Sequence, residues 1–148
     1  MSPDSSLPRL LRIVFVEDNP VDALTLKIAL QQAGIAFDLD VITHGDQGMA
    51  LARGEPPFRG EPPDLILLDL NIPGSDGKEV LSALRASRTF QNVRIGILTS
   101  SDVPRDWVDC RRAGADFYLH KPMTLDDLQS IGQVISALAV SPARSPQD

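Results

Sequence analysis

The sequence predicts an α/β fold in which helices cover both faces of a five-stranded parallel sheet. Strand and helix patterns alternate five times along the 148 residues, which is typical of parallel strands joined by crossover helices. Residues 65–68 are four consecutive aliphatic residues between turn signals, which indicates a strand buried on both faces. The length suits one domain with a single substantial core.

Each element is placed where a short apolar run or a 3.6-residue period lies between turn residues. The expected strands are residues 11–16, 37–43, 64–69, 93–98 and 116–119. The expected helices are residues 20–33, 45–53, 77–87, 104–113 and 124–139. Asp18 or Asn19 can cap the first helix, and Thr124 the last. Gly34 and Gly114 follow helical patterns and resemble C-terminal capping glycines.

Amino-acid composition distinguishes one central domain from the two ends of the chain. We expect flexible tails at residues 1–8 and 141–148, which are polar and carry serine and proline, around a domain at residues 9–140. Residues 54–63 contain four prolines, so they are expected to form a stiff surface loop rather than a helix or a central strand.

Charge and cysteine content exclude several classes of function. The net charge of −6 argues against direct binding of nucleic acid. No apolar run reaches transmembrane length and no signal-peptide pattern is present, so we expect no membrane partner. Cys110 is the only cysteine, which rules out an internal disulfide and favours a reducing, cytoplasmic location.

Polar residues follow four of the expected strands. Glu17 and Asp18 follow the first strand, Asp69 ends the third, Thr99 follows the fourth and Lys121 comes just after the fifth. Because the carboxyl ends of parallel strands meet at one edge, these side chains should converge. Three carboxylates repel one another, so the cluster needs a cation, and oxygen ligands favour Mg²⁺ or Mn²⁺.

This arrangement suits chemistry at phosphorus. Asp69 could act as a nucleophile, while Lys121 and a metal ion hold the phosphoryl oxygens and Thr99 donates a hydrogen bond to one of them.

At this point the chain resembles the receiver domain of a two-component response regulator, over residues 10–139. The ordered set of matching pieces is highly specific and consists of Glu17-Asp18, Asp69, Asn71, Pro73-Gly74, Gly77, Thr99-Ser100, Tyr118 and Lys121-Pro122. The resemblance implies a flavodoxin-like, doubly wound sheet with strand order 2-1-3-4-5. It also implies that the chain is a signalling phosphoprotein and not an enzyme, apart from slow self-dephosphorylation.

The resemblance assigns a role to each residue of the site. Asp69 would accept a phosphoryl group from a histidine kinase, in a Mg²⁺-dependent reaction, and Lys121 would contact that group. Asp18, Asp69 and the carbonyl of Asn71 would bind the metal ion, with Glu17 acting through water.

The resemblance further implies a conformational switch. Thr99 would turn toward the phosphoryl group and Tyr118 would move into the vacated space. The face formed by the fourth helix, the fifth strand and the fifth helix would change, and it includes Trp107 and Arg111.

A narrower resemblance concerns the partners. The proline-rich insertion is similar to that of stand-alone receivers partnered with phytochrome-type histidine kinases, such as bacteriophytochromes. The sequence ends after the fifth helix, so we expect no effector domain. The signal would then leave through a downstream phosphotransfer protein or through homodimerisation.

Three alternatives remain open. A degenerate receiver would act as an interaction module without phosphorylation. A flavodoxin-like FMN binder shares the strand pattern, although Glu17-Asp18-Asn19-Pro20 is a poor phosphate loop. An Asp-based phosphatase is disfavoured because Asn71 stands where a second acid is expected.

Overall fold

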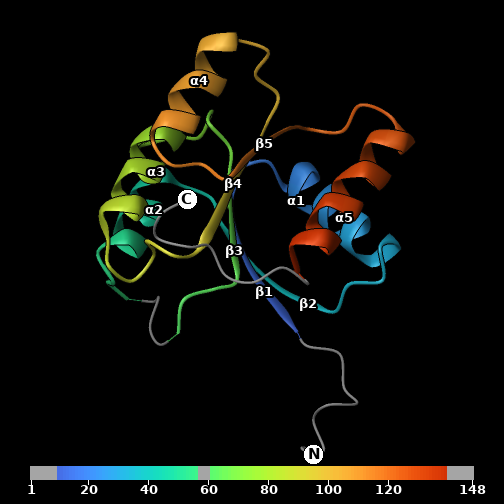
Figure 1. Ribbon diagram of the computed structural model, residues 1–148, viewed down its shortest axis with the longest axis horizontal. Coiled ribbons are helices and arrows are strands. Elements are labelled where there is room, and N and C mark those ends of the chain that lie inside the picture. Colours follow the sequence, from blue (N-terminus) through green and yellow to red (C-terminus); the bar gives the residue numbers. More distant parts are fainter. Residues whose placement is uncertain (1–9, 57–60, 140–148) are drawn as a thin grey trace, which may run out of the picture.

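Five parallel strands form the centre of the computed structural model, which describes residues 10–56 and 61–139 (Figure 1). The strands pair in the order β2-β1-β3-β4-β5, as the sequence predicts. Their bounds are β1 (Leu11–Val16), β2 (Phe37–Ile42), β3 (Leu65–Leu68), β4 (Arg94–Thr99) and β5 (Phe117–His120).

The helices lie in two layers, with α1 and α5 on one face of the sheet and α2, α3 and α4 on the other (Figure 1). Their bounds are α1 (Pro20–Gln32), α2 (Gly45–Ala52), α3 (Gly77–Ala86), α4 (Pro104–Arg112) and α5 (Leu125–Ala139). Every predicted element is present, and each end lies within one residue of the predicted position. The doubly wound α/β class is therefore confirmed.

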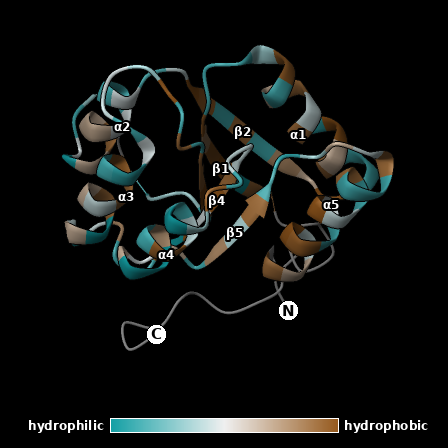
Figure 2. Cartoon of the chain, turned by 90° about the horizontal axis from the view of Figure 1, so that it is seen from above, coloured by the Kyte–Doolittle hydropathy of each residue, from teal (hydrophilic) through white to brown (hydrophobic). Residues whose placement is uncertain are grey.

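Two apolar cores lie on either side of the sheet. In Figure 2 hydrophobic residues gather along β1 and β4, between the two groups of helices. Strand β3 contributes to both cores: Ile66 and Leu68 pack toward α2 and α3, and Leu65 and Leu67 pack toward α1 and α5. Each of the four is at most 2% exposed, so the aliphatic run marks a strand buried on both faces.

The helix ends follow local chemistry. The side chain of Asn19, and not that of Asp18, caps α1 by accepting the N–H of Val21 at 2.9 Å. Gly34 and Gly114 adopt positive φ angles of 72° and 105° after α1 and α4, which confirms their predicted role.

Some sequence-based expectations fall outside the described residues. They are the tails at residues 1–8 and 141–148, and residues 57–60 of the proline-rich loop. Within the described ranges, none of the helices combines the length and apolar character needed to span a bilayer.

Arg85 of α3 joins several loops at the amino edge of the sheet. Its guanidinium donates to the carbonyl oxygens of Phe90 (3.1 Å), Val93 (2.7 Å) and Gly114 (2.8 Å), and it pairs with Asp116 at 2.7 Å. These acceptors are partly buried, so losing the guanidinium would remove their charged donor.

We expect Arg85→Met to lower the free energy of unfolding by about 3 kcal/mol, because partly buried acceptors lose a charged donor and Asp116 loses its cation. Urea unfolding of the purified chain measures the difference. Arg88→Met, at an exposed position in the turn that follows the same helix, is the control and should change stability by less than about 0.5 kcal/mol. Equal losses in the two variants would contradict the role given to Arg85.

Candidate functional site

The strand register brings the predicted acidic residues together at the carboxyl edge of the sheet. Val16 of β1 is paired with Leu68 of β3, so the residues that follow them, Glu17 and Asp69, are neighbours. Carboxylate oxygens of Glu17, Asp18 and Asp69 all lie within 4.8 Å of one another. We call these three residues the acidic cluster.

The acidic cluster is closed on one side and open on the other. Glu17 is 1% exposed and Asp69 is 3% exposed, whereas Asp18 is exposed. The backbone N–H of Asn71 donates to Oδ1 of Asp69 at 3.2 Å, which orients that carboxylate. The exposed side of the acidic cluster is therefore the side on which Asp18 lies.

Lys121 reaches the acidic cluster from the end of β5. Its Nζ lies 2.5 Å from Oε1 of Glu17 and 2.8 Å from Oδ2 of Asp69. The Lys121 backbone N–H donates to the carbonyl oxygen of Thr99 at 2.8 Å, which fixes the lysine next to β4. The predicted convergence of the ammonium with the carboxylates is thus present in the structure.

A third carboxylate, which our sequence analysis did not identify, also contacts the ammonium. Oδ2 of Asp22, in the first turn of α1, lies 2.7 Å from Nζ of Lys121. The available signal was its position, because a residue in the first turn of a helix that follows β1 lies near the same edge of the sheet as Glu17.

Burial shapes the ionisation of these groups. Desolvation, with the neighbouring Asp69, raises the pKa of Glu17 to about 8, although Lys121 opposes this. Burial alone would lower the pKa of Lys121, but its contacts with Asp22, Asp69 and Glu17 outweigh burial and raise it. Lys121 is therefore a permanent cation of the site.

Oε1 of Glu17 offers an oxygen to a second cation besides Lys121. This atom is buried and touches the ammonium, yet among the described residues it accepts no hydrogen bond of proper geometry. We therefore regard the contact with Lys121 as an ion contact rather than a directed bond. A buried carboxylate oxygen with a free lone pair, beside two further carboxylates, fits a hard divalent cation.

Thr99 and Tyr118 are connected through the loop that precedes α4. Thr99 is fully buried, and its Oγ1 accepts the N–H of Ser101 at 3.3 Å. The hydroxyl of Tyr118 donates to the carbonyl oxygen of Ser101 at 3.5 Å. Sequence reasoning did not find Ser101, because a serine in a loop gives no pattern that distinguishes it from its neighbours.

The start of α4 is held to the same loop by charged groups. Oγ of Ser101 contacts Asp106 at 2.5 Å, and Nζ of Lys78 pairs with Asp106 at 2.7 Å and Asp109 at 2.9 Å. Hydrogen bonds from Lys78 and then Ser101 lower the pKa of Asp106. Lys78 thus links α3 to α4 beside the site.

A doubly wound sheet with a buried aspartate, two further acids and a lysine at its carboxyl edge defines a receiver-type α/β domain. Comparison with known proteins gives the family. The model of the response regulator receiver domain matches residues 13–132, so the chain belongs to the response regulator receiver family. Membership decides against the flavin-binding and phosphatase alternatives.

Response regulators are also similar over nearly the whole chain. Rcp1 of Synechocystis sp. (strain ATCC 27184 / PCC 6803 / Kazusa) is 30% identical over 138 residues, which cover 93% of this chain and 92% of Rcp1. The structure of the phosphorylated cyanobacterial phytochrome response regulator RcpA has a TM-score of 0.83 at 26% identity, and the match covers 93% of this chain and 100% of RcpA.

Two similar structures contain a metal ion. The Mn²⁺-bound form of Rcp1 has a TM-score of 0.79 at 28% identity, covering 91% of this chain and 99% of that one. The receiver domain of sensor histidine kinase PA1611 from Pseudomonas aeruginosa PAO1 carries magnesium in its active-site cleft. It has a TM-score of 0.66 at 30% identity, covering 85% of this chain and 97% of that domain.

Glu17 should make the stability of the metal-free chain depend on pH. Below its ordinary pKa of 4.5, Glu17 is protonated in the folded and unfolded chains alike. As the pH rises from 4.5 to about 8, only the unfolded chain releases the proton, so stability falls. The contribution of Glu17 has a maximum slope of about 1.4 kcal/mol per pH unit.

Urea unfolding in EDTA at a series of pH values measures this slope. Glu17→Gln lacks the titrating group, so its profile should be flatter than that of the wild type across this window. Parallel profiles would show that Glu17 is not protonated in the folded chain.

Proposed function

We propose that this chain is a stand-alone response regulator that accepts a phosphoryl group on Asp69 from a histidine kinase and signals by a conformational switch. One observation carries the proposal: the buried carboxylate of Asp69 lies between the ammonium of Lys121 and two further acids, in a chain of the receiver family. The match to Rcp1, which covers 92% of that protein, supports the stand-alone form.

The transfer step follows from this geometry. An oxygen of Asp69 forms a bond to phosphorus while the bond from phosphorus to the imidazole nitrogen of the donor histidine breaks, and the imidazole keeps the electron pair. Lys121 is close enough to Asp69 to neutralise charge on the transferred group. Thr99 is a candidate donor to the same group once its hydroxyl leaves the N–H of Ser101.

A divalent cation completes the charge balance. We propose that Asp18, Asp69 and the carbonyl of Asn71 bind Mg²⁺, with Glu17 acting through water, and that Mn²⁺ can replace it. The buried Oε1 of Glu17, which accepts no hydrogen bond among the described residues, and the ions bound in the Rcp1 and PA1611 structures support this assignment. When bound, the cation screens the negative charge of the phosphoryl oxygens.

The similarity to Rcp1 and RcpA supports a phytochrome-type histidine kinase as the partner. We expect this transfer to occur in the cytoplasm, because the kinase takes its phosphoryl group from ATP. Slow self-dephosphorylation would return the chain to its resting state, unless a downstream phosphotransfer protein takes the group first.

We expect Asp69→Asn to abolish uptake of a phosphoryl group from a cognate histidine kinase with ATP and Mg²⁺, because the amide is a poor nucleophile. Intact mass measurement of the chain detects the added group. Asp40→Asn, which changes an exposed carboxylate on β2, is the control and should be phosphorylated normally. Excess EDTA should stop transfer to the wild type.

Normal uptake by Asp69→Asn would place the phosphoryl group elsewhere. Failure of the wild type to take up a group from any donor, with partner binding retained, would favour a receiver that acts only as an interaction module.

The output surface is the face formed by α4, β5 and α5. Trp107 of α4 is 43% exposed, and the guanidinium carbon of Arg111 lies 5.2 Å from the centre of its ring. Exposed tryptophan and arginine are enriched at the centres of protein interfaces. Tyr118 joins this face to the loop at Ser101 and so to the site.

We expect Trp107→Ala and Arg111→Glu to weaken association by about tenfold, either between two copies or with a partner, while phosphorylation of Asp69 continues. Analytical ultracentrifugation with and without beryllofluoride, which imitates the phosphoryl group, measures self-association. Arg88→Glu, on an exposed position outside this face, is the matched control. Wild-type association by both variants would place the output surface elsewhere.

A further inference from the structure

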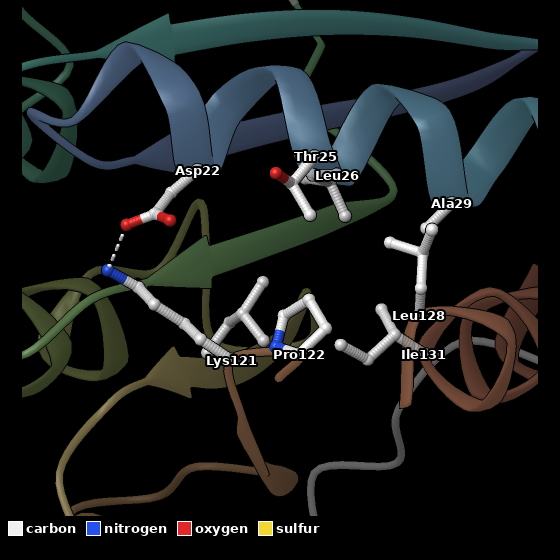
Figure 3. A pocket seen from close by; sticks show the side chains of 9 residues that line it. Asp22, Thr25, Leu26, Ala29, Lys121, Pro122, Leu128 and Ile131 are labelled. Atoms are coloured by element: carbon white, nitrogen blue, oxygen red, sulfur yellow. Dashed lines mark hydrogen bonds and ion pairs between the residues drawn. The ribbon is translucent and has the colours of Figure 1, made fainter. Parts of the chain in front are cut away.

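Asp22 is distinct among the three carboxylates that contact Lys121. Glu17 and Asp69 follow strands and belong to the acidic cluster, whereas Asp22 comes from α1 and lies outside the cluster. Figure 3 shows the side chains of Asp22 and Lys121 pointing toward each other, with Oδ2 2.7 Å from Nζ. The ammonium donates hydrogen bonds to Asp22 and Asp69, and it meets Glu17 in an ion contact.

The surroundings strengthen the contact between Asp22 and Lys121. The pair closes one end of a small cavity between α1 and α5, and apolar side chains such as Leu26, Leu128 and Ile131 line the rest (Figure 3). The cavity volume is only about 10 Å³, which is room for one water molecule at most. An ion pair backed by apolar groups is screened less than one on an open surface.

The three contacts cannot all persist during the proposed reaction. A divalent cation would compete with Lys121 for the oxygens of Glu17 and Asp69, and an oxygen of Asp69 would become bonded to phosphorus. Asp22 has neither task, so it is the one partner that can hold the ammonium throughout.

We infer that Asp22 is a positioning residue: it anchors Lys121 from α1 so that the ammonium meets the phosphoryl oxygens both during transfer to Asp69 and during hydrolysis of the phosphorylated form. This inference rests on the proposed function of Asp69. In hydrolysis, water bonds to phosphorus and the bond to the Asp69 oxygen breaks. The products are the Asp69 carboxylate, inorganic phosphate and a proton released to solvent.

The two reactions should depend on Asp22 in the same way, because each places extra negative charge on phosphoryl oxygens near Lys121. Without its anchor, Lys121 samples several positions, and a small displacement of a group that stabilises the transition state is costly. We expect Asp22→Asn to slow both transfer and hydrolysis by about tenfold, a modest loss beside the roughly hundredfold that a misplacement of about 1 Å can cause.

The test uses the full chain with acetyl phosphate at saturating Mg²⁺. This donor needs no protein docking surface: Asp69 takes the phosphoryl group and acetate leaves. The rates of uptake and of loss are followed by intact mass. Asp22→Asn and Asp22→Ser should slow both rates, and Asp22→Glu, which restores the negative charge, should recover most of each.

Two controls separate positioning from packing and from net charge. Thr25→Ala changes the wall of the same cavity without touching Lys121, and Asp38→Asn removes an exposed carboxylate on β2. Both should react at the wild-type rate, and thermal melting establishes that each variant is folded.

The outcomes distinguish this inference from the proposed function. If the wild type gains no phosphoryl group from acetyl phosphate or from a histidine kinase, the proposed function fails. If the wild type reacts and the neutral Asp22 variants match it within about twofold in either rate, Asp22 does not position Lys121. A defect seen only with the kinase would make Asp22 a docking residue and would also overturn the inference.

Discussion

The site depends on one interaction, the contact of a single ammonium with carboxylates from three parts of the chain. Lys121 follows β5, whereas Asp69 follows β3, so β4 lies between them and the lysine must extend past the end of that strand. The charges are mostly buried, and buried charges without partners would cost several kcal/mol each. The ion contacts therefore require β1, β3, β5 and α1 to keep their relative positions.

A second constraint concerns α4, which is attached to the domain differently from the other helices. Its only fully buried residue is Cys110, and much of its attachment comes from Lys78 and Ser101 contacting Asp106 and Asp109. Contacts between charged groups at a half-exposed position can exchange at lower cost than packed apolar side chains. An element held in this way is suited to adopt a second position, as the proposed switch requires.

The sequence predicts the parts of this structure that depend on local pattern and topology. The aliphatic run before Asp69 indicates a buried strand, and parallel strands bring Glu17, Asp18, Asp69 and Lys121 to one edge. The residue types alone allow either Asp18 or Asn19 to cap α1, and only the backbone geometry shows that Asn19 does so. The contacts of Asp22, Ser101 and Arg85 are different, because they depend on side-chain direction and on how closely helices approach the sheet.

The charge balance explains why the lysine and a metal ion have separate tasks. Glu17, Asp18, Asp22 and Asp69 face one ammonium, which gives the site a formal charge of −3 when all are ionised. Burial and the neighbouring Asp69 raise the pKa of Glu17, which opposes this fully ionised state. A dianionic phosphoryl group would be repelled from such a site unless a divalent cation offset most of the charge. The cation and the phosphoryl group then occupy oxygens that Lys121 contacts at rest. Lys121 therefore needs a partner outside the acidic cluster. Among the described carboxylates that contact its ammonium, only Asp22 meets that requirement.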